Sequence, residues 1–90
     1  MGHKVLIVDD EAHIRLLIEQ TLEELEERGV EILTAANGEE ALDLIRAKKP
    51  SLVFLDVMLP RMNGFDVCDR VRNAWGMRDV YIVMLTAKGQ

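Results

Sequence analysis

The sequence predicts an α/β fold in which a parallel β-sheet carries helices on both of its faces. Two observations lead to this fold class. Four short apolar segments alternate with three longer amphipathic ones, and three of the apolar segments end directly before an Asp or a Thr. Such alternation is typical of parallel sheets, because the connection between two parallel strands must cross the sheet and is usually a helix. We expect one domain over residues 1–90 with a single core.

The first predicted unit is a strand followed by an amphipathic helix. Residues 5–8 are a short apolar run rich in β-branched side chains, which favours a strand buried on both faces. Gly29 is a plausible end for the helix that follows, because glycine readily adopts the left-handed backbone conformation. A row of glutamates lies opposite the apolar stripe of this helix. The stripe consists of Ile14, Leu17, Ile18, Leu22 and Leu25.

The second unit has clearer boundaries. Residues 32–36 form the second predicted strand, and Asn37 followed three residues later by Glu40 is the signature of a capped helix start. The helix is expected to end at residues 48–50, where two lysines face the negative end of the helix dipole and a proline cannot continue the helix.

The third unit repeats this pattern. Residues 52–55 are the third predicted strand, residues 57–63 a loop, and residues 80–85 the fourth strand. A helix begins at about Gly64. Its expected core stripe consists of Phe65, Cys68, Val71 and Trp75.

Polar residues follow the predicted strands. Asp9 and Asp10 end the first strand, Asp56 ends the third and Thr86 ends the fourth. Because parallel strands end at one edge of a sheet, the three carboxylates share a pocket if the first and third strands are neighbours. Adjacent carboxylates resist full ionisation unless a cation compensates them, and Mg²⁺ suits such an oxygen site. Asp56 is then the candidate nucleophile towards phosphorus, and Thr86 a candidate donor to a phosphoryl oxygen.

Four segments of the chain resemble the receiver domain of bacterial response regulators. They are VLIVDDE at residues 5–11, NGEEAL at 37–42, LDVMLP at 55–60 with Gly64, and MLTA at 84–87. Each motif alone is weak, but together they span the whole chain in order and at the family's spacings. The resemblance implies a flavodoxin-like, CheY-like sheet with strand order 2-1-3-4, which places the first and third strands side by side.

The resemblance also implies roles for individual residues. Asp56 would receive a phosphoryl group from a sensor histidine kinase, with Mg²⁺ or Mn²⁺ as the cofactor. Asp10, Asp56 and the backbone carbonyl of Met58 would bind the metal directly, whereas Asp9 would act mainly through a metal-bound water. The implied function is a two-component signalling switch in the cytoplasm, not an enzyme that turns over an external substrate.

The last residues of the chain carry the remaining implied roles. Thr86 would turn towards the phosphoryl group as the switch, and the small Ala87 would leave room for access. Receivers continue past the fourth strand with a helix, a fifth strand and a final helix, which supply a phosphate-pairing lysine. Lys88 follows Thr86 too closely to replace that lysine. We therefore expect a receiver truncated after the fourth strand, with impaired phosphotransfer and switching.

The fourth strand would also be an exposed apolar edge. A long uncovered edge presents unpaired backbone groups and invites pairing with another chain. We expect a dimer or a larger homo-oligomer. The self-association edge would consist of Val80, Tyr81, Ile82, Val83, Met84 and Leu85.

Composition excludes several classes of protein. Hydrophobic residues make up 49% of the chain, which excludes a disordered protein, and no apolar run is long enough to span a bilayer. A net charge of −5 argues against a nucleic-acid partner, because phosphates would be repelled. The single cysteine, Cys68, excludes an internal disulfide and fits the cytosol.

Other functions stay open at this point. A metal-dependent phosphatase would commonly carry a second acid two residues after its nucleophile, where this chain has Met58. A phosphorylation-inactive fragment that acts as a self-association module would need only the sheet and its edge. A nucleotide-binding domain is disfavoured, because no glycine-rich phosphate loop follows the first strand.

Overall fold

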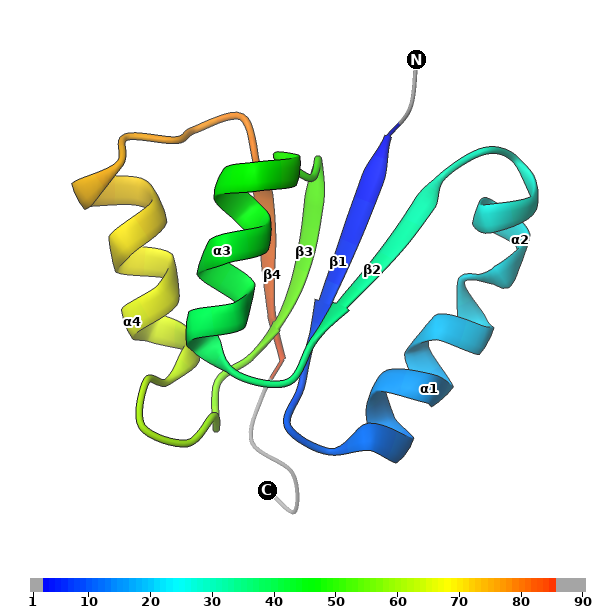
Figure 1. Cartoon of the computed structure of the whole chain (residues 1–90), viewed down its shortest axis with the longest axis horizontal. Coiled ribbons are helices and arrows are strands. Elements are labelled where there is room, and N and C mark those ends of the chain that lie inside the picture. Colours follow the sequence, from blue (N-terminus) through cyan, green and yellow to red (C-terminus); the bar gives the residue numbers. More distant parts are fainter. Residues whose placement is uncertain (1–2, 86–90) are drawn as a thin grey trace.

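The computed structural model of the chain describes residues 3–85, which form a parallel four-stranded sheet with helices on both faces (Figure 1). The strand order is β2-β1-β3-β4, which confirms the predicted order 2-1-3-4. Val8 of β1 lies opposite Leu55 of β3, so these two strands end side by side. The strands are β1 (Lys4–Val8), β2 (Glu31–Ala35), β3 (Leu52–Asp56) and β4 (Tyr81–Leu85).

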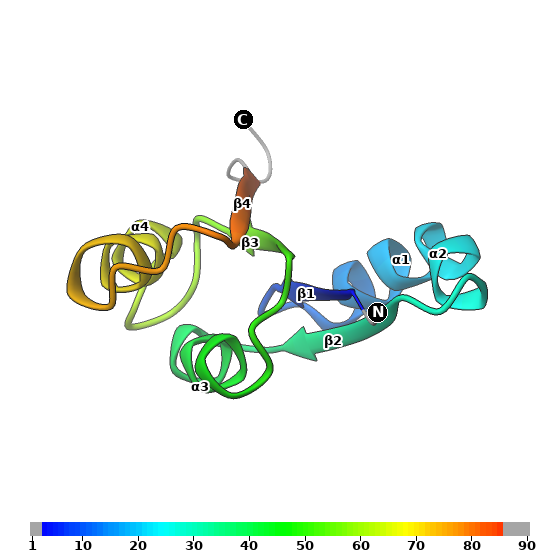
Figure 2. The ribbon, with the colours of Figure 1, turned by 90° about the horizontal axis from the view of Figure 1, so that it is seen from above.

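The helices divide between the two faces of the sheet. α3 and α4 cover one face and α1 and α2 lie on the other (Figure 2). Helix α4 continues directly into η1, a π-helical segment in which the Trp75 amide donates to the Arg70 carbonyl at 3.0 Å. The helices are α1 (Ala12–Thr21), α2 (Glu23–Glu27), α3 (Gly38–Lys48), α4 (Gly64–Asp69) and η1 (Arg70–Ala74). Within residues 3–85, no helix has the length and apolarity that a membrane crossing requires.

The core lies between the sheet and the pair α3 and α4. Alternate residues of β1 and β3 point into this core, and Ala41 and Ile45 of α3 cover it on the helix side. The α4–η1 stripe was predicted only in part, because Phe65 is 62% exposed while Val67 and Val71 are fully buried. Residues four apart on a helix share one face, so burial of Val71 selects Val67 and turns Phe65 outwards. The strand residues in this core are Leu6, Val8, Ala35, Val53 and Leu55.

The first predicted helix is two helices. It breaks at Leu22, whose amide is shared between the carbonyls of Ile18 and Glu19, and α2 begins at Glu23. None of the residues in α1 or α2 is fully buried, and Leu17 of the predicted stripe is 59% exposed. The predicted end is confirmed, because Gly29 adopts a φ of 95°.

The start of α3 is confirmed in detail. The Asn37 side chain accepts a hydrogen bond from the Glu40 amide at 2.8 Å, and the Glu40 carboxylate accepts one from the Ala36 amide at 2.6 Å. These bonds satisfy backbone donors that have no partner inside the helix. The helix ends at Lys49, which has a φ of 50°, directly before Pro50. Helix α3 is thereby fixed at both ends over the core.

Candidate metal centre

Three carboxylates meet where β1 and β3 end. Oxygen atoms of Asp9, Asp10 and Asp56 all lie within 4.8 Å of one another. Asp9 and Asp56 are 0% exposed, whereas Asp10 is exposed to solvent. The predicted convergence of these side chains is therefore confirmed, and the cluster reaches from the protein interior to its surface.

The chain around Asp9 holds its carboxylate in a fixed orientation. The Asp9 amide donates to the Ala35 carbonyl at 3.2 Å and so extends the pairing of β1 with β2 by one residue. The Glu11 amide donates to Asp9 Oδ1 at 2.9 Å, just before α1 begins. The Arg15 guanidinium donates to the Asp9 carbonyl oxygen at 2.7 Å. The carboxylate thus sits in a turn that is anchored on both sides.

The Asp56 carboxylate is held in a similar way. Its Oδ1 accepts a hydrogen bond from the Met58 amide at 3.0 Å, so the loop after β3 folds back over the strand end. The Val57 amide donates to the Leu85 carbonyl at 3.2 Å and ties this loop to β4. Two buried carboxylates that each accept an amide hydrogen bond are thereby placed side by side.

Gly64 allows the loop after β3 to pass close to the strand end, a role that the sequence did not reveal. A Cβ atom at this position would lie 2.6 Å from the Asp56 carbonyl oxygen and 3.0 Å from the Val57 Cα. The Gly64 amide donates to the Val57 carbonyl at 3.0 Å. The only sequence signal was a glycine directly after the helix cap Asn63, which is also common without a close approach.

The open side of the cluster is a pocket of about 630 Å³. Asp10 and Met58 both line it, together with residues of the loop that leads to α4. The side chains of Met58 and Phe65 are about three-fifths exposed, at 61% and 62%. Asp10, the carboxylate of the cluster that faces solvent, therefore shares its pocket with exposed apolar side chains.

The donor set fits a hard divalent cation. Burial of two carboxylates is costly unless a positive charge or hydrogen bonds compensate them, and mutual repulsion adds to the cost. Carboxylate oxygens are the ligands that Mg²⁺ prefers, and an exposed third carboxylate leaves positions for water or phosphate. No His or Cys belongs to the cluster, which argues against a zinc site among the described residues.

Some predicted site residues cannot be placed in this cluster. Thr86, Ala87 and Lys88 lie outside the described residues. Lys49 precedes β3 and lies at the opposite edge of the sheet, because the carboxylates follow the other end of the strand.

The fold and the cluster together define a class of protein: a parallel α/β domain with an acidic cluster at the carboxyl ends of its strands. A model of the response regulator receiver domain matches residues 5–90, and the chain belongs to this family. The resemblance seen in the sequence is confirmed. Receiver domains of response regulators are two-component signalling domains that bind Mg²⁺ at an acidic cluster and are phosphorylated by sensor histidine kinases.

Relatives of known name are transcriptional regulators. The probable transcriptional regulator ycf27 of Porphyra purpurea is 49% identical over 87 residues, which cover 97% of this chain and 33% of that protein. The alkaline phosphatase synthesis transcriptional regulatory protein PhoP of Bacillus subtilis (strain 168) is 43% identical over 90 residues, with 100% and 35% covered. The chain thus spans about a third of the length of the curated relatives it matches.

Solved receiver structures share the fold. The N-terminal domain of a response regulator receiver protein from Methanoculleus marisnigri JR1 superposes with a TM-score of 0.83 at 35% identity, covering 98% of this chain and 69% of that one. The response regulator TrrA of Thermotoga maritima, solved in complex with Mg²⁺–BeF, gives 0.79 at 41% identity, covering 97% and 71%. Neither set of relatives supports a phosphorylation-inactive assembly module.

Proposed function

We propose that the chain is a phosphoacceptor switch of a cytoplasmic two-component system, in which Asp56 receives a phosphoryl group from a sensor histidine kinase. The observation that carries this proposal is the cluster of three carboxylates within 4.8 Å, two of them buried and one open to solvent. Such an arrangement has no evident use in folding, because it places like charges together in a region of low dielectric.

The phosphoryl transfer would form one bond and break one. An oxygen of the Asp56 carboxylate attacks phosphorus, and the bond from phosphorus to the imidazole nitrogen of the kinase breaks. The imidazole takes up a proton as it leaves, and an acyl phosphate remains on Asp56. The Met58 amide, which donates to Oδ1 of Asp56, orients the carboxylate before the attack. Positioning of this kind is a main source of rate in phosphoryl transfer.

The proposed metal ligands are Asp10, Asp56 and the backbone carbonyl of Met58, with Asp9 acting through a water molecule. The position of Asp10 and Met58 on one open pocket supports this assignment. So does the relative TrrA, which was solved in complex with Mg²⁺–BeF. A bound Mg²⁺ would neutralise the negative charge that develops on the phosphoryl oxygens. Thr86 and Ala87 remain the proposed switch and access residues.

Intact-mass spectrometry after incubation with Mg²⁺ and acetyl phosphate tests the proposed acceptor. We expect a single phosphoryl adduct that needs both the metal and Asp56, and that is absent from Asp56→Asn. Asp43→Asn is the matched control, because Asp43 is an exposed acid on α3. An adduct that persists in Asp56→Asn would refute Asp56 as the acceptor, and no adduct on the unchanged chain would refute phosphorylation of this chain by itself.

A second proposal concerns assembly. We propose that the chain self-associates along β4 (Tyr81–Leu85), the last strand in the order β2-β1-β3-β4. Val80, which the sequence placed on this edge, is instead 3% exposed and belongs to the core. Tyr81 on this strand is 71% exposed, and the pairing of β4 with β3 leaves its other side open among the described strands. Light scattering at high concentration should show a dimer or larger species. A single monomeric species over the whole concentration range would contradict this proposal.

A further inference from the structure

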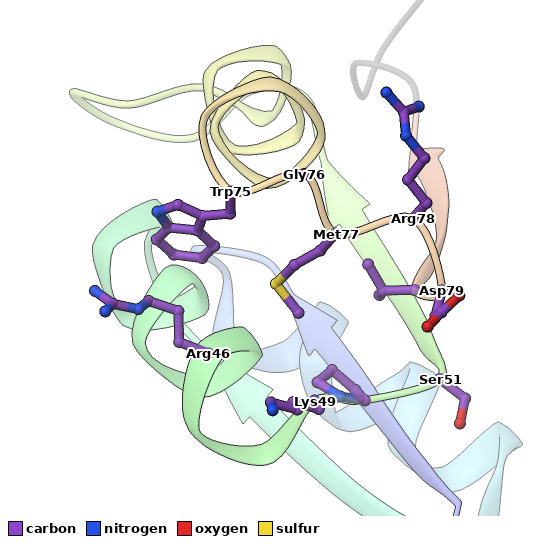
Figure 3. Close-up of a pocket in the computed structure, with 10 residues that line it drawn as sticks. Arg46, Lys49, Ser51, Trp75, Gly76, Met77, Arg78 and Asp79 are labelled. Atoms are coloured by element: carbon purple, nitrogen blue, oxygen red, sulfur yellow. The ribbon is translucent and has the colours of Figure 1, made fainter.

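A second pocket lies at the amino-terminal edge of the sheet, away from the carboxylate cluster. It has a volume of about 720 Å³ and is formed where α3 ends, where β3 begins, and where the chain runs from η1 into β4 (Figure 3). The five residues of β3 separate it from Asp56, a distance of about 17 Å at the usual rise of a strand. The two pockets share no lining residue.

The floor of this pocket is apolar. Met77 points into its centre from the segment after η1 (Figure 3), and the buried residues Pro50 and Val80 complete the floor. Trp75 forms one wall and is half-buried. A lining that combines a thioether, a proline ring and an indole suits a flat apolar group.

Hydrogen bonds hold the walls in place. The Met77 amide donates to the Val71 carbonyl at 2.9 Å, and the Arg72 guanidinium donates to the Met77 carbonyl at 3.0 Å. The Tyr81 amide donates to the Ser51 carbonyl at 2.8 Å and joins the two chain segments that border the pocket. These three hydrogen bonds thus connect the chain segments that border the pocket within the protein itself.

The charge around the pocket is positive, although the chain carries a net charge of −5. Arg46, Lys49 and Arg78 line it, against a single acid, Asp79. Ion pairs among residues 3–85 join Arg28 to Glu24 and Arg61 to Glu39, so none involves the cations of this pocket.

Arg46 and Lys49 flank the pocket from the side of α3 (Figure 3). The Arg46 guanidinium lies over the Trp75 ring, 5.0 Å from its centroid, which orders the cation at the pocket wall. Arg78 lies on the opposite rim and points outwards (Figure 3). Arg46 and Lys49 are therefore the two cations that line the pocket on the side of α3.

We propose that this pocket binds a small anionic ligand with a flat apolar body. The anionic group lies between Arg46 and Lys49, and the body rests on Met77 beside Trp75. The volume falls in the range of pockets for small molecules, which are mostly apolar with a few placed charges. Binding here is independent of the phosphoacceptor function proposed for Asp56.

The test is an NMR titration of the chain with naphthalene-2-carboxylate, followed by its indole N–H signal. Trp75 is the only tryptophan, so this signal is unambiguous and reports on the pocket wall. We expect saturable shifts of the Trp75 indole and the Met77 amide. The neutral naphthalene-2-carboxamide, which has the same shape, should bind about tenfold more weakly, the factor that corresponds to 1.4 kcal/mol.

Paired variants separate charge from shape. Arg46→Gln with Lys49→Gln should weaken binding of the carboxylate about tenfold and leave binding of the carboxamide unchanged. Arg28→Gln with Arg61→Gln removes the same charge far from the pocket and should leave both affinities unchanged. The proposal is overturned if the carboxamide binds as tightly as the carboxylate, if both double variants weaken binding equally, if the shifts fall on β4 instead, or if no saturable shift occurs.

Discussion

The two edges of the sheet carry charges of opposite sign, and they differ in how deeply those charges are buried. At the carboxyl-end edge, Asp9 and Asp56 are fully buried and Asp10 lies beside them. At the amino-end edge, Arg46 and Lys49 remain exposed around an apolar floor. Solvent screens the exposed cations, so their placement costs little. The buried carboxylates have no such screening.

This difference shows which feature is the stronger indicator of function. Buried like charges are costly to the free protein, and clusters of them are concentrated at ligand and reaction sites. Exposed cations indicate a binding site only where a second feature supports that interpretation. Here the second feature is the apolar pocket beneath them. The following predictions test this contrast, beginning with the largest expected effect.

The largest effect is expected on the affinity of the chain for Mg²⁺. Asp9→Asn keeps an oxygen that can accept from the Glu11 amide but removes one of the buried charges. Loss of an outer partner of a metal typically lowers affinity by about 10-fold to 100-fold, and we expect this loss for Mg²⁺ in calorimetric titration. Asp43→Asn, at an exposed site, should bind Mg²⁺ normally. Equal affinities of the two variants would contradict the assignment of Asp9.

The glycines at the two edges should respond differently to alanine. Gly64→Ala forces a Cβ to 2.6 Å from the Asp56 carbonyl, and overpacking of this kind costs roughly 1–3 kcal/mol in the free energy of unfolding. The same change should weaken Mg²⁺ binding, because the strand end must move. Urea denaturation and a Mg²⁺ titration measure the two effects.

Gly76→Ala is the matched change at the other edge. Gly76 has a φ of 66° and no atom within 4 Å of an added Cβ, so only the left-handed backbone opposes alanine, at about 1–2 kcal/mol. Mg²⁺ affinity should stay unchanged. If Gly76→Ala weakened Mg²⁺ binding as much as Gly64→Ala does, the two edges would not be independent.

Repulsion within the cluster predicts a stabilising substitution. Without metal, Asp56→Asn should raise the free energy of unfolding by about 1 kcal/mol, because it removes one charge and keeps an acceptor for the Met58 amide. With saturating Mg²⁺ the advantage should vanish or reverse, since the unchanged chain then gains from binding. Urea denaturation with and without Mg²⁺ measures both. A destabilised Asp56→Asn in the absence of metal would contradict mutual repulsion.

The smallest effect is expected for the stacked arginine. Arg46→Met removes the guanidinium from the Trp75 ring and should lower the free energy of unfolding by about 0.5–1 kcal/mol, the contribution of an exposed cation–π contact. Lys48→Met on the same helix, whose side chain is also exposed, should change stability less. Thermal denaturation compares the two, and equal losses would show that the stack does not contribute.

The sequence predicted the sheet from the alternation of apolar and amphipathic segments. It predicted the carboxylate cluster from the acids that directly follow the strands. Once Asp9 and Asp56 terminate neighbouring parallel strands, their proximity is a consequence of topology. The break at Leu22 was not predictable, because leucines and glutamates continue through it at helical spacing. The sequence wrongly placed Phe65 in the core stripe. Val67, four residues before Val71, lies on the buried face of the helix instead.

The amino-end pocket was also missed. Its residues come from two segments that are far apart in the sequence, residues 46–51 and 75–80, and neither segment carries a motif. The turn that presents Trp75 and Met77 depends on the π-helical end of η1, which local propensities do not predict.

The measurement that tests the central claim most directly is a Mg²⁺ titration of the chain followed by amide NMR. The Glu11 and Met58 amides donate to Asp9 and Asp56, so their signals should shift and saturate together. The Ser51 and Met77 amides at the other edge should not move. Shifts confined to Glu11 and Met58 would establish a divalent-cation site at the carboxyl-end edge, whereas no saturable shift there would contradict it.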